Sequence, residues 1–130
     1  MTKEIRVNNN LVVTKTIEED RLLFELSGRL DSINAPEFEY IVKDSLDDVH
    51  ALVFDLEKLE YISSAGLRVF LISHKRMEKQ GKMVLINVKD AVYRVFSLTG
   101  FSEVLNIVKK MNKSQFKEYY EKYYEDHNAD

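Results

Sequence analysis

The sequence of 130 residues contains no cysteine, which excludes disulfide bonds and thiolate chemistry. No apolar run approaches the roughly 18 residues that a membrane-spanning helix needs, and the first residues carry no apolar signal core. The formal net charge is only -3, so the chain has no strong overall attraction for nucleic acid or anionic lipid. These absences favour a cytoplasmic domain large enough to bury one core.

Patterns typical of catalytic and ligand-binding sites are also scarce. The three histidines share no ligand spacing with one another or with paired carboxylates, which argues against a metal site. A glycine-rich phosphate loop is excluded because the four glycines stand alone, at positions 28, 66, 81 and 100. No base stands close in sequence to a serine that could act as a nucleophile. We therefore expect no catalytic residue, no metal and no cofactor, in a protein that is not an enzyme.

The hydrophobic pattern predicts an α/β fold. Two strand-forming runs separated by a polar turn indicate a hairpin within 11–26. Pro36 and the helical spacing after it predict a first helix capped by Asn34. The elements that follow alternate, which implies crossover connections and at least partly parallel strands. They are a buried strand at 51–54, a short polar link after Asp55, a helix at 64–80, a strand at 83–88, a helix from Asp90 to near Gly100 and a strand at 105–108.

Two adjacent serines, Ser63 and Ser64, open the helix predicted at 64–80. A helix N-terminus carries positive partial charge and free backbone N–H groups, so it tolerates a phosphate. Phosphorylation of one of these serines is therefore the first functional hypothesis. A glycine in the first turn makes the helix about 1 kcal/mol less stable than an alanine would. Gly66 therefore indicates that something approaches the helix closely at this point, either backbone, a neighbouring loop or a partner.

The helix at 64–80 has more than one apolar side. Val69 and Ile72 fall beside Arg68, and two interpretations of them remain open. Either a neighbouring helix covers them, or they belong to a protein-binding surface next to the serines. The main stripe is expected to pack on the sheet, and it consists of Leu67, Phe70, Leu71 and His74.

Residues 109–130 differ in composition from the domain predicted at 1–108. Lysine and glutamate dominate there, yet five aromatic residues recur at helical spacing: Phe116, Tyr119, Tyr120, Tyr123 and Tyr124. This pattern predicts a C-terminal helix with a narrow aromatic stripe that docks on another surface. The stripe either packs on its own domain or contacts a partner, which includes a second copy of the chain in a homodimer.

Four pieces of the sequence stand in a specific order between about residues 5 and 108. They are Gly28-Arg29-Leu30-Asp31 with Asn34-Ala35, the strand Leu52-Val53-Phe54-Asp55-Leu56, the serine segment from Tyr61 to Leu67, and Leu98-Thr99-Gly100-Phe101. Together these pieces resemble the STAS domain family of bacterial anti-sigma factor antagonists. The resemblance implies a mixed β-sheet with helices packed largely on one face, to which the C-terminal helix is an addition.

The resemblance also implies a function. Such an antagonist, when unphosphorylated, binds an anti-sigma factor that is also a serine kinase, and a sigma factor is released. The kinase then phosphorylates a serine at this helix start, the complex dissociates, and a metal-dependent serine phosphatase restores the active form. The acceptor aligned with the family pattern is Ser64, with Ser63 as the fallback, although the usual Asp before it and hydroxyl residue after it are here Ser63 and Ala65. The predicted partner-binding residues are Asp31, Asn34, Ser63, Ser64, Ala65, Gly66, Arg68, Val69 and Ile72.

Two other functions remain open. Some proteins of this shape resemble constitutive interaction subunits of membrane transporters, including lipid-trafficking complexes, in which the serine need not be phosphorylated. A third possibility is a module that binds a nucleotide or another small ligand between the strand ends and the helix start.

Overall fold

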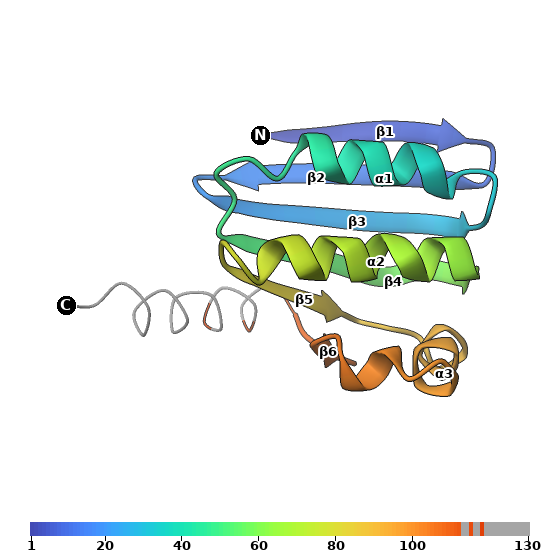
Figure 1. Cartoon of the computed structure of the whole chain (residues 1–130). Helices are drawn as coiled ribbons and strands as arrows, with labels where there is room; N and C mark the ends of the chain where they lie inside the picture. Colours follow the sequence, from blue (N-terminus) through green and yellow to red (C-terminus); the bar gives the residue numbers. More distant parts are fainter. Residues whose placement is uncertain (113–114, 116–117, 119–130) are drawn as a thin grey trace.

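The computed structural model describes residues 1–112, 115 and 118, and within them the chain forms a six-stranded sheet with three α-helices (Figure 1). The strands are Thr2–Asn8 (β1), Leu11–Glu18 (β2), Arg21–Leu30 (β3), Ala51–Ile62 (β4), Lys82–Ile86 (β5) and Ile107–Val108 (β6). The helices are Ala35–Asp44 (α1), Ser64–Met77 (α2) and Asp90–Leu98 (α3), followed by the short 3-10 helix Phe101–Glu103 (η1).

The spatial order of the strands equals their order in the chain, β1-β2-β3-β4-β5-β6. β1, β2 and β3 pair antiparallel, whereas β3, β4, β5 and β6 pair parallel. Each parallel pair in a sheet needs a crossover, and α1, α2 and α3 provide these crossovers. The predicted hairpin and the predicted parallel half of the sheet are therefore both confirmed.

Two strands differ most from the prediction. β1 was not predicted at all, because its sequence Thr-Lys-Glu-Ile-Arg-Val-Asn is mostly polar. β4 continues to Ile62, so the polar link expected after Asp55 is wrong. The pairing of β4 with β3 shifts between Glu25 and Ser27, and this bulge changes which residues of β4 face the core. The buried residues Leu56, Leu59 and Ile62 therefore do not alternate regularly, and alternation is the signal by which a strand is predicted.

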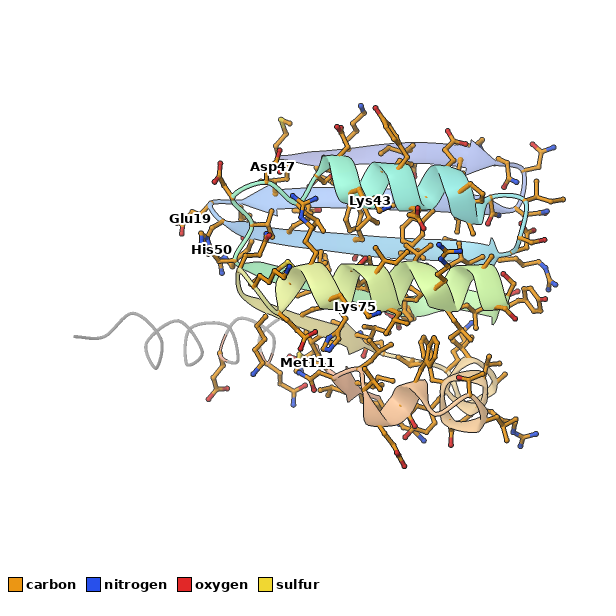
Figure 2. The ribbon with its side chains drawn as sticks, in the orientation of Figure 1. Glu19, Lys43, Asp47, His50, Lys75 and Met111 are labelled. Atoms are coloured by element: carbon orange, nitrogen blue, oxygen red, sulfur yellow. The ribbon has the colours of Figure 1, made fainter. Side chains whose placement is uncertain are left out.

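α1 and α2 lie over one face of the sheet, in front of the strands in Figures 1 and 2, and α3 adds Val92 and Phe96 to the core on that side. The largest side chains buried there are phenylalanines from both layers: Phe24, Phe38, Phe54, Phe70 and Phe96. The rings of Phe54 in β4 and Phe70 in α2 meet edge to face with centroids 4.9 Å apart. Phe24 of β3 stacks on Phe54 at 5.6 Å. Aromatic contacts of this kind add to the stability gained from burial, and they fix α2 over the centre of the sheet.

The opposite face of the sheet, which we call the helix-free face because α1, α2 and α3 lie on the other side, has a smaller apolar cluster. Val53, Val84 and Ile86 are buried there, and Leu23, Val108 and Met111 pack against them. The prediction that β4 begins as a strand buried on both faces is thus confirmed, because Leu52 and Phe54 point into the larger core.

The ends of the later helices differ by a few residues from the prediction. α2 ends at Met77 rather than at Gln80. Lys89, not Asp90, is the N-cap residue of α3. The aromatic C-terminal helix and the homodimer predicted through it lie outside the described residues, and the predicted boundary at residue 108 stays a prediction.

Candidate functional site

The ends of β3 and β4 bring the predicted site residues to one end of the sheet. Leu30 pairs with Ile62 in the parallel register, and the Ser63 N–H donates to the Leu30 carbonyl at 2.9 Å. The loop at 31–34 and the two serines therefore begin side by side, and α1 and α2 both start there, at the arrowheads of β3 and β4 (Figure 1).

The two serines have different roles at the start of α2. Ser63 is the N-cap residue, and its Oγ accepts a hydrogen bond from the Gly66 N–H at 3.2 Å. Ser63 thus supplies the side-chain cap of α2. Ser64 is the first helical residue, it is exposed, and its hydroxyl has no hydrogen bond to the described residues. Its side chain therefore stands in solvent beside the positive end of a 14-residue helix.

Gly66 lets α2 approach the end of β3 closely. A Cβ atom on Gly66 would lie 2.8 Å from Cγ of Leu30, closer than real Cβ atoms approach, and 3.0 Å from Cγ1 of Ile62, which is a tight contact. The close neighbours are thus side chains of two strands, which is none of the three approaches expected for this glycine. Gly66 is buried, so the structure shows a packing role, and its contact with a partner stays a prediction.

Asp31 and Asn34 hold the loop between β3 and α1. Asp31 Oδ1 accepts from the backbone N–H groups of Ile33 and Asn34, both at 2.9 Å. Asn34 Oδ1 accepts from the Asp31 N–H, and its Nδ2 donates to the Arg29 carbonyl, again both at 2.9 Å. Asn34 is only 2% exposed and makes no side-chain cap bond to α1. Asn34 is thus the N-cap residue of α1, as predicted, although its side chain bonds to the loop and to Arg29 rather than to the helix. Its contact with a partner stays a prediction.

The exposed side of α2 is narrower than the sequence suggested. Val69 is 1% exposed and belongs to the main core, so its prediction as a surface residue is wrong. The reason is that α1 packs beside α2 and covers this flank, which was the other interpretation of the wide apolar stripe. Ala65 and Ile72 are half-buried, whereas Arg68 is exposed. Ser64, Arg68 and Ile72 are spaced four residues apart and so form one row along the helix.

Two apolar residues at this end of the sheet were missed by the sequence analysis. Ile33, in the loop before α1, is 81% exposed. Tyr61, near the end of β4, is 40% exposed, and the Arg29 guanidinium lies 4.1 Å from the centre of its ring. Exposed apolar side chains gathered beside polar ones are typical of protein-binding surfaces. No local signal reveals them, because isoleucine and tyrosine in such positions are usually buried by the fold.

Neither of the two histidines in the described part of the chain supplies a base to the serines. His50 pairs with Asp20 at 3.3 Å and lies, with Glu19 and Asp47, at the opposite end of the sheet (Figure 2). His74 lies in the last part of α2, near Glu78. Among the described residues no group of three or more histidine, cysteine, aspartate or glutamate side chains could hold a metal ion.

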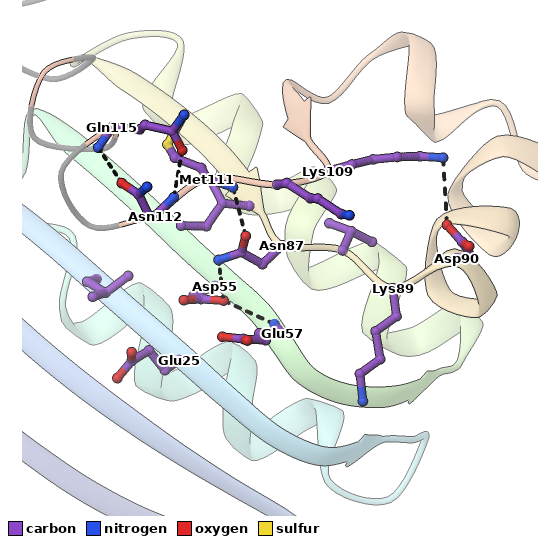
Figure 3. Close-up of a pocket in the computed structure, with 14 residues that line it drawn as sticks. Glu25, Asp55, Glu57, Asn87, Lys89, Asp90, Lys109, Met111, Asn112 and Gln115 are labelled. Atoms are coloured by element: carbon purple, nitrogen blue, oxygen red, sulfur yellow. Dashed lines mark hydrogen bonds and ion pairs between the residues drawn. The ribbon is translucent and has the colours of Figure 1, made fainter.

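A cavity of about 840 Å³ lies on the helix-free face rather than at the serines (Figure 3). Its central polar side chains already have partners. Asn87 Oδ1 accepts from the Met111 N–H at 2.8 Å, and Asn87 Nδ2 donates to Asp55 Oδ1 at 3.3 Å. Asp55 Oδ1 also accepts from the Glu57 N–H at 3.0 Å. These bonds fasten the segment after β6 to the sheet, and the third possibility, a ligand site between strand ends and helix start, finds no support here.

A search for membrane-spanning segments in the described part of the chain identifies no helix with sufficient length and hydrophobicity.

The sequence matches known proteins over most of its length. Residues 10–114 match the family model of the STAS domain. The BtrV protein of Bordetella bronchiseptica is 38% identical over 84 residues, which make up 63% of this chain and 72% of BtrV. The anti-sigma-B factor antagonist of Listeria monocytogenes is 29% identical over 105 residues, or 76% of this chain and 89% of that protein.

Solved structures share the same fold. The anti-sigma factor antagonist SpoIIAA of Bacillus, in its unphosphorylated form, matches with a TM-score of 0.70 at 15% identity, over 94% of this chain and 97% of SpoIIAA. A sulfate transporter family protein from Wolinella succinogenes matches with a TM-score of 0.65 at 17% identity, over 79% of this chain and 88% of that one. At such identities the structures are evidence for the fold alone, and they confirm the mixed sheet with helices on one face.

Proposed function

The chain belongs to the STAS domain family, and from that premise we propose that it is an anti-sigma factor antagonist switched by phosphorylation of Ser64. In its unphosphorylated form it binds an anti-sigma factor that is also a serine kinase, and a sigma factor is released. A serine phosphatase restores this form after phosphorylation. The observation that carries the proposal is the exposed, unbonded hydroxyl of Ser64 at the start of α2. The curated relative named as an anti-sigma-B factor antagonist supports the partner class.

The proposed contact surface consists of the exposed and half-buried residues around Ser64. Arg68 and Ile72 extend it along α2, and Ile33 with Tyr61 adds apolar area beside the helix start. Asn34, Gly66 and Val69 act from below by keeping the loop and the helix in place. The chain thus works by binding, in the cytoplasm, and the chemistry belongs to the kinase and the phosphatase.

The transfer of the phosphoryl group to Ser64 needs no base from this chain, because the kinase accepts the proton of the serine. The Ser64 Oγ attacks the γ-phosphorus of ATP bound to the kinase, loses its proton to that enzyme, and ADP leaves. The product carries about -1.5 to -2 charge at neutral pH. On the free protein the N-terminus of α2 stabilises this charge, and Arg68 stands one turn further along the same face. In a packed interface the same group has to lose its water, which opposes binding unless the partner supplies cations.

Binding to the cognate anti-sigma factor kinase tests the proposal. Ser64→Asp is expected to weaken the complex by about a hundredfold, the effect of roughly 3 kcal/mol from an uncompensated interface charge. Ser64→Ala is expected to bind as tightly as the wild type and to take up no phosphate when incubated with kinase and ATP. Ser63→Ala is the matched control, because it retains Ser64 and should still be phosphorylated. Undiminished binding by Ser64→Asp, or phosphate uptake by Ser64→Ala, contradicts the proposed switch.

The alternative function is a constitutive subunit of a membrane transporter complex. The fold shared with the Wolinella transporter family protein favours it only at the level of architecture. Mass spectrometry of the protein isolated from its native cells separates the two functions. Phosphoserine at 64 together with a bound kinase supports the switch, whereas an unmodified serine and a co-purified transporter support the alternative.

A further inference from the structure

The outer edge of β1 lies apart from the surface that the proposed function uses. β1 is a seven-residue strand at one edge of the sheet, and it precedes the residues that match the family model. The other edge strand, β6, has only two residues. Thr2, Lys3, Glu4 and Arg6 are exposed along β1. A strand of this length presents unpaired backbone groups that can bind another strand.

The backbone groups that face outward follow from the pairing with β2. Met1 and Ile17 exchange two backbone hydrogen bonds, of 2.9 and 3.0 Å. Hydrogen-bonded and non-bonded pairs alternate along an antiparallel ladder, and the register pairs Thr2 with Thr16, then continues without a shift to Arg6. Lys3 and Ile5 therefore direct their N–H and C=O groups towards β2. Thr2, Glu4 and Arg6 direct theirs to the outer edge.

The charges on this edge favour one way of pairing β1 with itself. In an antiparallel pair centred on Ile5, Glu4 of each copy lies opposite Arg6 of the other, and both residues have outward backbone groups. Two opposite-charge pairs then form across the new ladder. Moving the axis by one residue places Glu4 opposite Glu4, or Arg6 opposite Arg6, and like charges directly opposite each other are unfavourable. The sequence of β1 is thus complementary to itself in the register centred on Ile5.

The two faces of β1 fit this register as well. Glu4 lies in one row across the helix-free face with Thr14, Glu25 and Asp55. Arg6 of a second copy would add a positive charge at the end of this acidic row. On the other face, Ile5 is half-buried and packs against the main core. A second Ile5 across the axis would cover its remaining exposed surface.

We propose that a second copy of this chain binds the outer edge of β1, antiparallel and centred on Ile5, so that two sheets become one continuous sheet. β2 and β3 separate β1 from β4, whose end carries the serines. The dimer therefore leaves both Ser64 surfaces open, and one particle presents two of them. This assembly is independent of the proposed phosphorylation.

A charge-exchange experiment tests the pairing by sedimentation velocity over a wide range of protein concentration. The wild type is expected to dimerise. Glu4→Arg and Arg6→Glu each place like charges opposite one another twice and should raise the dimer dissociation constant by at least about tenfold. An equal mixture of the two variants should form a heterodimer, because positions 4 and 6 are then both positive in one copy and both negative in the other. The double variant Glu4→Arg/Arg6→Glu should recover the homodimer.

Lys3→Glu is the control, because Lys3 lies opposite the uncharged Val7 in this register and its change should leave the dimer intact. All changed side chains are exposed, and thermal unfolding checks that each variant folds. A wild type that stays monomeric at every concentration overturns the proposal. That result is expected if the charges of β1 serve only to protect the edge from pairing with other strands. A dimer that survives equally in both single variants also overturns it, since the contact then lies on another surface.

Discussion

The starts of α1 and α2 lie at the same end of the sheet, yet they use their polar side chains in opposite ways. At α1, Asp31 and Asn34 bond to the backbone of their own loop, and Asn34 is buried. At α2, Ser63 provides the cap, and the Ser64 hydroxyl makes no bond to the described residues. The polar side chains at the start of α1 are therefore used within the fold, whereas the start of α2 leaves one exposed hydroxyl without such a bond. Exposure and free bonding capacity, rather than residue type alone, therefore distinguish a functional polar residue from a supporting one.

The largest expected effect on stability comes from removing the hydrogen bonds of Asn34 at the start of α1. Asn34→Ala removes the partners of the Asp31 N–H and the Arg29 carbonyl, and unsatisfied buried groups cost about 1 to 3 kcal/mol each. We expect the free energy of unfolding, measured with urea, to fall by about 3 kcal/mol. Ser32→Ala, an exposed change in the same loop, should leave it nearly unchanged. A loss no larger than that of Ser32→Ala would mean that the network around Asn34 contributes little.

A smaller effect is expected from the packing beneath α2. Gly66→Ala forces a Cβ atom against Leu30, and overpacking costs about 1 to 3 kcal/mol, offset by about 1 kcal/mol of helix propensity. We expect a net loss of about 1 kcal/mol in the free energy of unfolding. In a Leu30→Ala background the same change should cost less, because the clashing side chain is gone. A double-mutant cycle measures this coupling, and an equal cost in both backgrounds would contradict the contact.

The smallest effects distinguish the two serines. Ser63→Ala removes the cap of α2 and should lower the free energy of unfolding by about 1 kcal/mol. Ser64→Ala removes no internal bond and should change it by less than about 0.5 kcal/mol. Thermal unfolding of the two variants, side by side, makes this comparison. Equal losses would show that Ser64 is as structural as Ser63, and the contrast between the two helix starts would be lost.

The sequence predicted the parts of the fold that have local signals. Proline and polar turns marked where elements begin or end, and apolar periodicity identified the three helices and most strands. β1 was missed because only Ile5 and Val7 are apolar, and the end of β4 was missed because the bulge opposite β3 interrupts alternation. Ser64 was predicted from the helix start and from the family pattern around it.

The errors at the site depend on contacts between elements distant in sequence. Val69 is buried because α1 covers its side of α2, and the sequence left that interpretation open. Asn34 resembles an ordinary helix cap until the loop around Asp31 is seen. Ile33 and Tyr61 are exposed because none of the described helices and strands packs over them. Exposure is a property of the assembled fold, so composition and spacing cannot assign it residue by residue.

Leu30 connects the two strand ends to α2 in two ways, since its carbonyl accepts from Ser63 and its side chain fills the space beside Gly66. This double attachment holds the helix start against the end of β3. A phosphoryl group on Ser64 would then alter the surface charge without altering the shape of the domain. In an NMR spectrum the two forms should differ in the amide signals of the first turn of α2 and its immediate neighbours, while the signals of distant strands coincide. Any partner would have to recognise the charge itself.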